Sequence, residues 1–203
     1  MWLPALWAAK PVILVLGDSL SAGHGIDADR GWVTLLQKRL TREGYSWQVV
    51  NASVSGDTSS GGLSRLPGAL RRYQPSLVII ELGGNDGLRG LDLNVMEHNL
   101  ARAVTRARQA GARVLLVGVR MPPNYGPAYT RRFTRTYQAV AKRLDVAWVP
   151  NLLSGVDDRP GLMQQDGIHP LAKAQPRMLD NVWAHLRPLL RGNARTAGPA
   201  ATP

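Results

Sequence analysis

Four short segments of the chain carry residue types that are capable of nucleophilic and acid–base chemistry. The first is Gly17-Asp18-Ser19-Leu20, in which a serine hydroxyl is followed by small residues that permit a tight turn into a helix. A hydroxyl at the start of a helix lies near the positive end of the helix dipole, which favours a developing oxyanion. Serine and aspartate are also common turn and N-cap residues, so this segment alone leaves both interpretations open.

The second segment places an acid and a histidine three positions apart, at Asp166 and His169. A carboxylate at this spacing accepts a hydrogen bond from one ring nitrogen and leaves the other free to face a nucleophile. Metal binding is the alternative for such a pair, but no second cluster of histidine or carboxylate accompanies it, so we expect no metal. The other histidines, His24, His98 and His185, lack a comparable context and are interpreted as surface or packing residues.

The remaining two segments contain glycine and offer neutral hydrogen-bond donors. Gly56 allows a ligand to approach its backbone N–H closely, and Asp57 or Thr58 is expected to cap the next helix. Asn85 follows two glycines and supplies a side-chain amide, which stabilises an oxyanion without attracting a permanent counter-ion. The alternatives are an ordinary loop at Gly56 and a left-handed turn asparagine at Asn85.

The elements that must position these segments alternate between strands and helices. Segments with apolar residues at helical spacing lie between short, continuous apolar runs, which are typical of strands covered on both faces. The runs are Val12–Leu16, Trp47–Val50, Leu77–Leu82, Val114–Val119 and Val146–Val149. The pattern predicts the α/β class, with a five-stranded parallel sheet in a three-layer α/β/α sandwich.

In such a sheet, active sites lie at the carboxyl ends of the strands. The serine, Gly56 and Asn85 segments each follow one of the first three apolar runs, so we expect them to share one site with Asp166 and His169. We expect one domain over residues 11–191. Residues 1–10 are expected to be an N-terminal extension or a signal-peptide remnant, and residues 192–203, which offer little to bury, a disordered tail.

Composition excludes several classes of function. The 203 residues contain no cysteine, which excludes disulfides, thiolate nucleophiles and sulfur-ligated zinc or iron–sulfur sites. The formal net charge of +11 favours contact with anionic surfaces. The arginines are scattered along amphipathic segments instead of being clustered with aromatic residues, so we expect no nucleic-acid partner. No apolar stretch of the sequence reaches the roughly 18 residues that span a bilayer.

Taken together, the segments resemble the conserved blocks of the SGNH, or GDSL, hydrolases in the same order along the chain. The matching residues are Gly17-Asp18-Ser19-Leu20, Gly56, Gly84-Asn85-Asp86 and Asp166-x-x-His169. More narrowly, residues 51–58, 81–90 and 166–170 resemble the bacterial multifunctional acyl-CoA thioesterase I/lysophospholipase L1 branch, the TesA-like arylesterases. The resemblance extends from about Val12 to Leu190 and implies the flavodoxin-like SGNH hydrolase fold.

The resemblance also implies a role for each site residue. Ser19 is the implied nucleophile, His169 the general base and Asp166 its orienting acid. The implied oxyanion hole consists of the backbone N–H groups of Ser19 and Gly56 and the side chain of Asn85. No cofactor is implied. Substrate contacts are expected from residues in or beside the four blocks and the 120–126 stretch, namely Asp18, Leu88, Leu91, Met121, Pro122 and Tyr125.

The implied activity is hydrolysis of ester and thioester bonds in small acyl substrates through an acyl-enzyme. Two alternatives stay open at this point: a carbohydrate deacetylase of the same family, which would need a polar groove, and a noncatalytic binding module. We expect a monomer, and the charge is compatible with peripheral contact to an anionic membrane surface. The expected location is periplasmic or secreted if residues 1–10 are a signal-peptide remnant, and cytoplasmic otherwise.

Overall fold

The structure is a computed structural model that describes residues 10–190 of the chain. Five parallel strands form one sheet in the order β2-β1-β3-β4-β5. The strands are β1 (Val12–Gly17), β2 (Gln48–Asn51), β3 (Leu77–Glu81), β4 (Arg113–Val117) and β5 (Ala147–Val149). This order is that of flavodoxin-like sheets, in which the strand order reverses between β1 and β3 and leaves a crevice at their carboxyl ends.

Helices connect the strands throughout the described residues. The α-helices are α1 (Ser19–Ala22), α2 (Trp32–Arg42), α3 (Ser59–Tyr73), α4 (Gly84–Leu88), α5 (Leu93–Gln109), α6 (Pro127–Leu144) and α7 (Gln175–Leu186). Short 3-10 helices are η1 (Ala28–Arg30), η2 (Pro123–Tyr125), η3 (Ala172–Ala174) and η4 (Arg187–Leu190). Of the helices in residues 10–190, none is long and apolar enough to cross a membrane.

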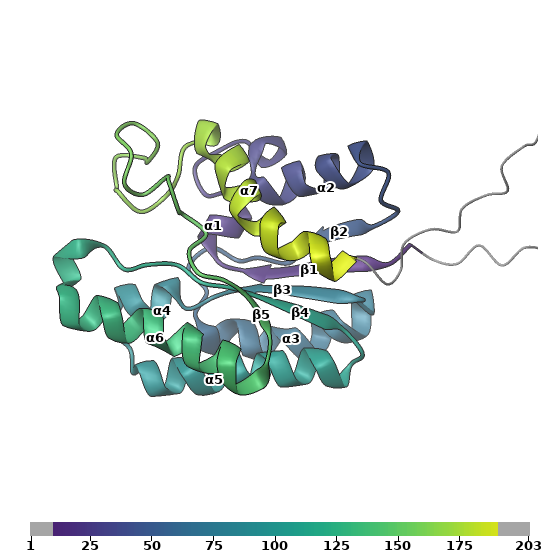
Figure 1. The fold of residues 1–203 in the computed structure, drawn as a ribbon, viewed down its shortest axis with the longest axis horizontal. Helices are drawn as coiled ribbons and strands as arrows, with labels where there is room; N and C mark the ends of the chain where they lie inside the picture. The colour runs from purple at the N-terminus through teal and green to yellow at the C-terminus, as the bar shows by residue number, and fades with distance from the viewer. Residues whose placement is uncertain (1–9, 191–203) are drawn as a thin grey trace, which may run out of the picture.

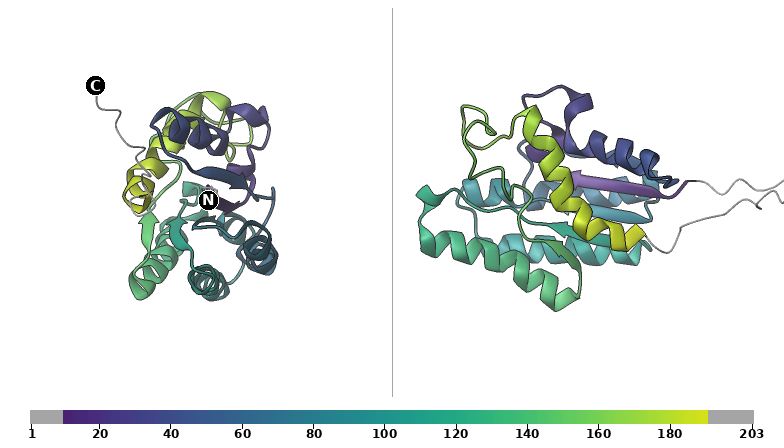
Figure 2. Two further views of the ribbon diagram at one scale, coloured as in Figure 1. Left: turned by 90° about the vertical axis from the view of Figure 1, so that its right-hand side faces the viewer. Right: turned by 45° about the horizontal axis from the view of Figure 1, so that its top comes forward.

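The helices cover both faces of the sheet, which gives three layers. Helices α1, α2 and α7 lie on one face, and α3, α4, α5 and α6 lie on the other (Figure 1). Helix α2 packs against α7, and α5 packs between α3 and α6. The two views of Figure 2 show the same sheet enclosed between these layers. The predicted α/β/α sandwich with a five-stranded parallel sheet is confirmed.

Burial along the strands follows from this layering. Every residue of β3 is buried, and so is every residue of β1 and β4 except the first of each strand, as continuous apolar runs predict. The edge strands β2 and β5 are only partly buried, although the sequence pattern predicts full cover for them as well. An edge strand has a neighbour on one side only, so its apolar side chains remain partly accessible.

The apolar runs agree with the strands to within two residues at each end. The largest difference is at β4, which ends at Val117, because the chain there leaves the sheet and Val119 lines the pocket described below. Residues 1–9 and 191–203 lie outside the described residues. The predicted N-terminal segment 1–10 and the predicted tail 192–203 therefore fall almost entirely outside them, and the domain division stays a prediction.

Candidate active site

Ser19 lies where β1 ends and α1 begins. The carboxylate of Asp18 caps this helix by accepting a hydrogen bond from the backbone N–H of Leu20 at 3.0 Å. The turn needs a glycine at position 17, because a Cβ atom there would lie 2.7 Å from the Cβ of Ser21. The sequence around Ser19 thus fixes a tight strand-to-helix turn at the carboxyl edge of the sheet.

The loop between β5 and α7 brings Asp166 and His169 to this turn. One carboxylate oxygen of Asp166 accepts the backbone N–H groups of Ile168 and His169 at 2.9 and 3.0 Å. Its other oxygen lies 2.6 Å from His169 Nδ1, and His169 Nε2 lies 2.9 Å from Ser19 Oγ. The three residues that the sequence singles out therefore form one continuous hydrogen-bonded path.

Asp166 is ionised at neutral pH. The partial burial of Asp166 raises its pKa. Hydrogen bonds from the His169 ring and from the backbone N–H groups of His169 and Ile168 together have a larger, opposite effect. The pKa of Asp166 is therefore lowered to about 2. An ionised Asp166 favours the His169 tautomer with its hydrogen on Nδ1. Nε2 is then free to accept the proton of the Ser19 hydroxyl.

Backbone and side-chain hydrogen bonds close the loop that carries Asp166 and His169. The backbone N–H of Gln164 donates to the carbonyl of His169 at 2.7 Å, and Leu171 N–H donates to the carbonyl of Leu162 at 2.8 Å. Met163 and Pro170 form an isolated antiparallel bridge between these two bonds. The loop therefore has its own local framework and does not belong to the main sheet.

His24 connects this loop to the segment that follows Ser19. Its ring lies against the His169 ring, with 4.4 Å between the centroids and a tilt of 40°. Its carbonyl accepts a hydrogen bond from the Gln164 side chain at 2.8 Å. The sequence indicates only a surface or packing role for His24. Its position beside His169 depends on a contact between segments that are about 140 residues apart, which no local pattern reveals.

Asn85 lies in the first turn of α4, directly after the glycine pair Gly83-Gly84, where the chain passes from β3 into this helix. Gly83 has φ +111°, a conformation that disfavours a side chain. The Asn85 amide nitrogen donates to the carbonyl of Asp57 at 2.9 Å and to Asp18 Oδ2 at 3.2 Å. The contact with Asp18 is at the long end of the N–H···O range, so it is the one that an incoming oxyanion can share or replace.

Gly56 lies in the loop between β2 and α3, with φ +82°. Its carbonyl accepts a hydrogen bond from Arg89 at 2.8 Å, and the next residue, Asp57, forms an ion pair with Arg65. Thr58, one of the two predicted caps, accepts a hydrogen bond from the first turn of α3. The loop is thus anchored on both sides of Gly56.

Two acidic side chains are buried beneath the Ser19 turn. Asp18 is 2% exposed and Glu81, at the end of β3, is 1% exposed. Burial raises the pKa of Asp18 to about 6, although hydrogen bonds from Leu20 and Asn85 act in the opposite direction. Burial, followed by the negative charge of Asp18, raises the pKa of Glu81 well above its usual range. Of the two side chains, Glu81 is therefore the one on which burial and charge favour a proton, while Asp18 keeps the lower pKa.

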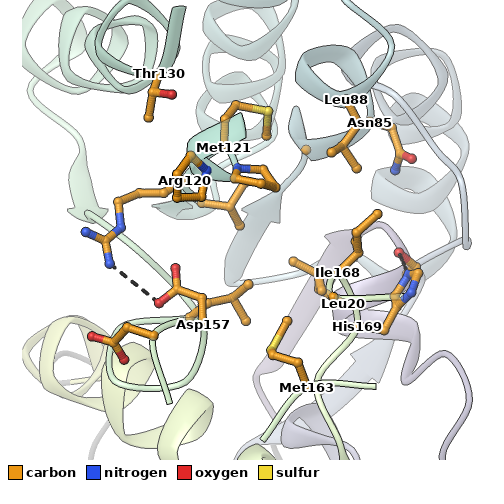
Figure 3. Close-up of a pocket in the computed structure, with 18 of the residues that line it drawn as sticks. Leu20, Asn85, Leu88, Arg120, Met121, Thr130, Asp157, Met163, Ile168 and His169 are labelled. Atoms are coloured by element: carbon orange, nitrogen blue, oxygen red, sulfur yellow. Dashed lines mark hydrogen bonds and ion pairs between the residues drawn. The ribbon is translucent and has the colours of Figure 1, made fainter. Parts of the chain in front are cut away.

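A pocket of about 870 Å³ opens beside Ser19 and His169 (Figure 3). Most of its wall is apolar, which suits the hydrocarbon chain of an acyl group. The apolar side chains that line it are Leu20, Leu88, Val119, Met121, Pro122, Pro123, Pro127, Leu153, Met163 and Ile168. Gly56 is not among the lining residues, whereas Asn85 is.

Four of the six predicted substrate contacts line this pocket, namely Asp18, Leu88, Met121 and Pro122. Leu91 and Tyr125 do not line it. Leu91 lies beyond the end of α4 and is 44% exposed. The Tyr125 hydroxyl donates to the carbonyl of Leu88 at 3.0 Å and its ring stacks on Tyr129, so Tyr125 supports the pocket wall from outside.

Charged residues that the sequence does not single out as contacts also line the pocket, although Arg120 begins the 120–126 stretch that was expected to contact substrate. Arg120 lies 3.5 Å from Asp157, and Figure 3 shows this pair at the opposite end of the pocket from His169 and Asn85. Arg131 and Asp158 complete the set of charged lining residues added by the structure. Arg120 directly follows the fourth apolar run, where a strand ends, and this position was a signal for that residue alone. Among residues 10–190, no group of three or more His, Cys, Asp or Glu residues could hold a metal ion.

A hydroxyl bonded to an imidazole at the switch point of a parallel α/β sheet is the arrangement of a serine hydrolase. Comparison with known proteins shows to which family within this class the chain belongs. The chain belongs to the GDSL-like lipase/acylhydrolase family, whose model matches residues 15–175. It is therefore an enzyme that acts on ester bonds, as the resemblance of its motifs implies.

Two relatives and one solved structure illustrate the similarity. Esterase TesA of Pseudomonas aeruginosa is 57% identical over 183 residues, which cover 90% of this chain and 91% of the esterase. Thioesterase 1/protease 1/lysophospholipase L1 of Escherichia coli K12 is 43% identical over 187 residues, or 90% of this chain and 86% of that protein. A crystal structure of TesA superposes with a TM-score of 0.87 at 57% identity and covers 88% of this chain and 99% of its own.

Proposed function

We propose that this chain hydrolyses carboxylic ester and thioester bonds of small acyl substrates through an acyl-enzyme on Ser19. The observation that carries the proposal is the unbroken path from Asp166 through His169 to Ser19 at the mouth of an apolar pocket. Relatives that are named as an esterase and as a thioesterase and lysophospholipase support the same type of bond.

The first half-reaction transfers the acyl group to the enzyme. His169 Nε2 accepts the Ser19 proton while Oγ attacks the acyl carbonyl carbon. The backbone N–H groups of Ser19 and Gly56 and the Asn85 amide donate hydrogen bonds to the resulting oxyanion. The imidazolium is stabilised by ionised Asp166 and returns the proton to the departing alcohol or thiol. Water then repeats the sequence on the acyl-enzyme, and these steps require no cofactor.

Covalent labelling tests the assignment of Ser19. A fluorophosphonate should modify the wild-type protein at a single peptide that contains Ser19 and abolish hydrolysis of a chromogenic ester. Ser64→Ala is a matched control, because this exposed serine on α3 bonds only to a carbonyl of its own helix and its loss should leave labelling unchanged. A label on any other residue, or none, would contradict the proposal.

The pocket favours an acyl chain over the sugar of a carbohydrate deacetylase. With about 0.8 kcal/mol for each buried CH₂, kcat/KM should rise by up to about fourfold per added carbon in a series of acyl esters. The rise should stop where the chain meets the Arg120–Asp157 pair at the far end of the pocket. A flat response from acetyl to long acyl esters would favour the deacetylase instead.

We further propose that the active-site end of the molecule touches lipid surfaces. Among residues 10–190, all the exposed large hydrophobic side chains belong to segments that follow the carboxyl ends of β2 to β5, and these are Val54, Leu91, Val95, Tyr125 and Ile168. The net charge of +11 would add attraction to anionic lipid. Vesicles with and without anionic lipid, tested with Val95→Ser, would measure both contributions in a sedimentation assay.

We propose that the enzyme acts as a monomer, because Ser19, His169, Asp166 and Asn85 of a single chain complete the site. Light scattering of the purified protein tests this proposal. Location is proposed as periplasmic or secreted if residues 1–10 are a signal-peptide remnant, and cytoplasmic otherwise. Cell fractionation followed by N-terminal sequencing would decide between these locations.

A further inference from the structure

Glu81 ends β3 directly beneath the turn that carries Ser19. In the sheet it pairs with Gly17 of β1, and its side chain is almost completely enclosed. Its Oε2 accepts hydrogen bonds from the Ser21 hydroxyl at 2.7 Å and from the backbone N–H of Asp18 at 3.4 Å. No described N–H or O–H group donates to its Oε1, which is equally buried. The steps proposed for hydrolysis do not use this side chain.

Protonation of Glu81 satisfies Oε1. An ionised carboxylate only accepts hydrogen bonds, so an enclosed Oε1 without a donor would carry an uncompensated desolvation cost. A protonated Oε1 would be a donor, and the Asp18 carboxylate, whose side chain interacts with that of Glu81, would be its acceptor. Burial and the negative charge of Asp18 raise the pKa of Glu81 well above its usual range, and a hydrogen bond between the two side chains raises it further.

Asp18 links Glu81 to two parts of the site. Its Oδ1 accepts the backbone N–H of Leu20 and so caps the helix that begins with Ser19. Its Oδ2 accepts a hydrogen bond from the Asn85 amide. The position of the Asp18 carboxylate therefore sets both the Ser19 turn and the direction of the amide that faces the developing oxyanion.

We propose that Glu81 is a positioning residue, a neutral carboxylic acid whose hydrogen bond to Asp18 aligns the Ser19 turn with the Asn85 amide. This inference rests on the function proposed above. An ionised Glu81 would repel Asp18 and place a second negative charge beneath a site that must stabilise an oxyanion. The neutral acid avoids both effects while it still supports Ser21 through Oε2.

The other titratable groups around Glu81 and Asp18 are compatible with one proton held between these two carboxyl groups. Tyr137 is buried, and its pKa is raised well above 10 by burial and then by Glu81, Asp18 and Asp86, so its phenol stays neutral. Asp86 accepts hydrogen bonds from the backbone N–H and hydroxyl of Ser59 at 2.7 and 2.6 Å. His169, when charged, lowers the pKa of Asp18 and favours its ionised form.

Two substitutions of Glu81 test the role through activity. Glu81→Gln reproduces the pattern of the neutral acid, because its oxygen accepts from Ser21 and its amide N–H donates to Asp18. Glu81→Leu has a side chain of similar volume that can neither accept a hydrogen bond from Ser21 nor donate one to Asp18. We expect Glu81→Leu to lower kcat for a soluble ester by about tenfold or more with little change in KM, and Glu81→Gln to restore kcat to within about threefold of wild type. Equal loss in both variants, or no loss in Glu81→Leu, would overturn the proposal.

The protonation state is tested by pH-dependent unfolding, which needs no activity. Since the pKa of Glu81 is higher in the folded chain than the ordinary value of 4.5, the folded state binds more protons above that pH, and the free energy of unfolding falls as pH rises. Wild type should therefore lose stability relative to Glu81→Gln as pH rises above about 4.5. A difference that stays constant with pH would mean that folded Glu81 is ionised, and would contradict the inference.

Infrared spectroscopy provides a direct readout that also separates the two proposals. Wild type at neutral pH should show the band of a buried protonated carboxyl group, and Glu81→Gln should lack it. If this band and the unfolding data behave as expected while wild type hydrolyses no ester, the proposed function fails and the protonated pair stands. If wild type hydrolyses esters but the band is absent, the inference about Glu81 fails alone.

Discussion

Asp166 and Asp18 are both ionised acids of the site, yet their surroundings are opposite. The Asp166 side chain is 42% exposed on a loop, and local hydrogen bonds lower its pKa to about 2. Asp18 is 2% exposed between β1 and β3, and burial raises its pKa to about 6. Solvent exposure and local hydrogen-bond donors stabilise the charge of Asp166. The charge of Asp18 is kept in the interior at a cost in free energy.

The same contrast divides the whole site into two halves. The loop half, residues 162–171, carries Asp166 and His169 and is closed mainly by bonds within itself. The sheet half consists of Asp18, Glu81 and Asn85, which come from strand ends that are distant in sequence, and Ser19 lies where the two halves meet. We therefore expect substitutions in the loop half to change activity alone, and substitutions in the sheet half to change activity and stability together.

The largest effect is expected where the two halves meet. Ser19→Ala removes the hydroxyl that His169 contacts at 2.9 Å, and should lower kcat by about five orders of magnitude because no other group is placed to attack. Its melting temperature should stay close to that of wild type, since little packing is lost. Residual activity above about one per cent in a pure sample would remove Ser19 from the role of nucleophile.

Asp166→Ala tests the loop half by itself. Loss of the carboxylate leaves His169 without its orienting acceptor and should lower kcat by about 10³- to 10⁴-fold. The loss of stability at neutral pH should be small, because solvent screens the charge of the exposed Asp166 side chain. A lowered pKa adds stability above the ordinary value of 3.8, and this contribution disappears as pH falls toward 2, so wild type and variant should converge in acid unfolding. A large loss of stability at pH 7 would contradict the independence of the loop.

Some features of the two halves follow from local sequence patterns, and others do not. Local apolar runs predict the strands and the residues at which they end. Because the carboxyl ends of parallel strands meet at one edge of the sheet, the positions of Ser19 and Asn85 follow. The spacing of Asp166 and His169 is also local. The contact of His24 with His169 and the Arg120–Asp157 pair are not predictable in this way, because each joins segments whose approach depends on how long loops fold back.

Leu91 and Tyr125 are predicted from the sequence to contact substrate, but they do not line the pocket. Both are apolar or aromatic residues near predicted strand ends, and pattern alone places them with Leu88 and Met121 in the groove. Which face a loop residue presents is decided by tertiary contacts such as the bond from the Tyr125 hydroxyl to the carbonyl of Leu88. Strand ends thus predict the neighbourhood of the site, but not the lining of its pocket.

Asn85→Ala tests the sheet half, with an expected effect on activity below that of the loop acid. Loss of one oxyanion donor should lower kcat about a hundredfold with a smaller change in KM, because the amide acts mainly on the transition state. The amide also joins Asp57 and Asp18, so the free energy of unfolding should fall by about 1–2 kcal/mol. A change confined to KM would indicate ground-state binding, and an unchanged stability would weaken the contrast between the halves.

The smallest effect is expected at Asp57, which lies beside the sheet half without contributing its side chain to the chemistry. Its backbone carbonyl accepts the Asn85 amide at 2.9 Å, and this carbonyl is retained in Asp57→Ala. The substitution removes the ion pair with Arg65, but Arg65 keeps its bond to the carbonyl of Ala52 at 2.7 Å. The loop should therefore shift only slightly, and kcat should fall by about two- to tenfold.

Arg65→Ala and Asp57→Asn are the matched controls for this last prediction. Removing Arg65 breaks the same ion pair from the other side, and Asp57→Asn keeps the shape of the side chain that packs against Gly61. If the ion pair only stiffens the loop, both variants should stay within the same tenfold range, with a stability loss of about 1 kcal/mol or less. A hundredfold fall in kcat for Asp57→Ala, equal to that for Asn85→Ala, would mean that the Asp57 side chain sets the direction of the oxyanion donor. The sheet half would then extend into the β2–α3 loop.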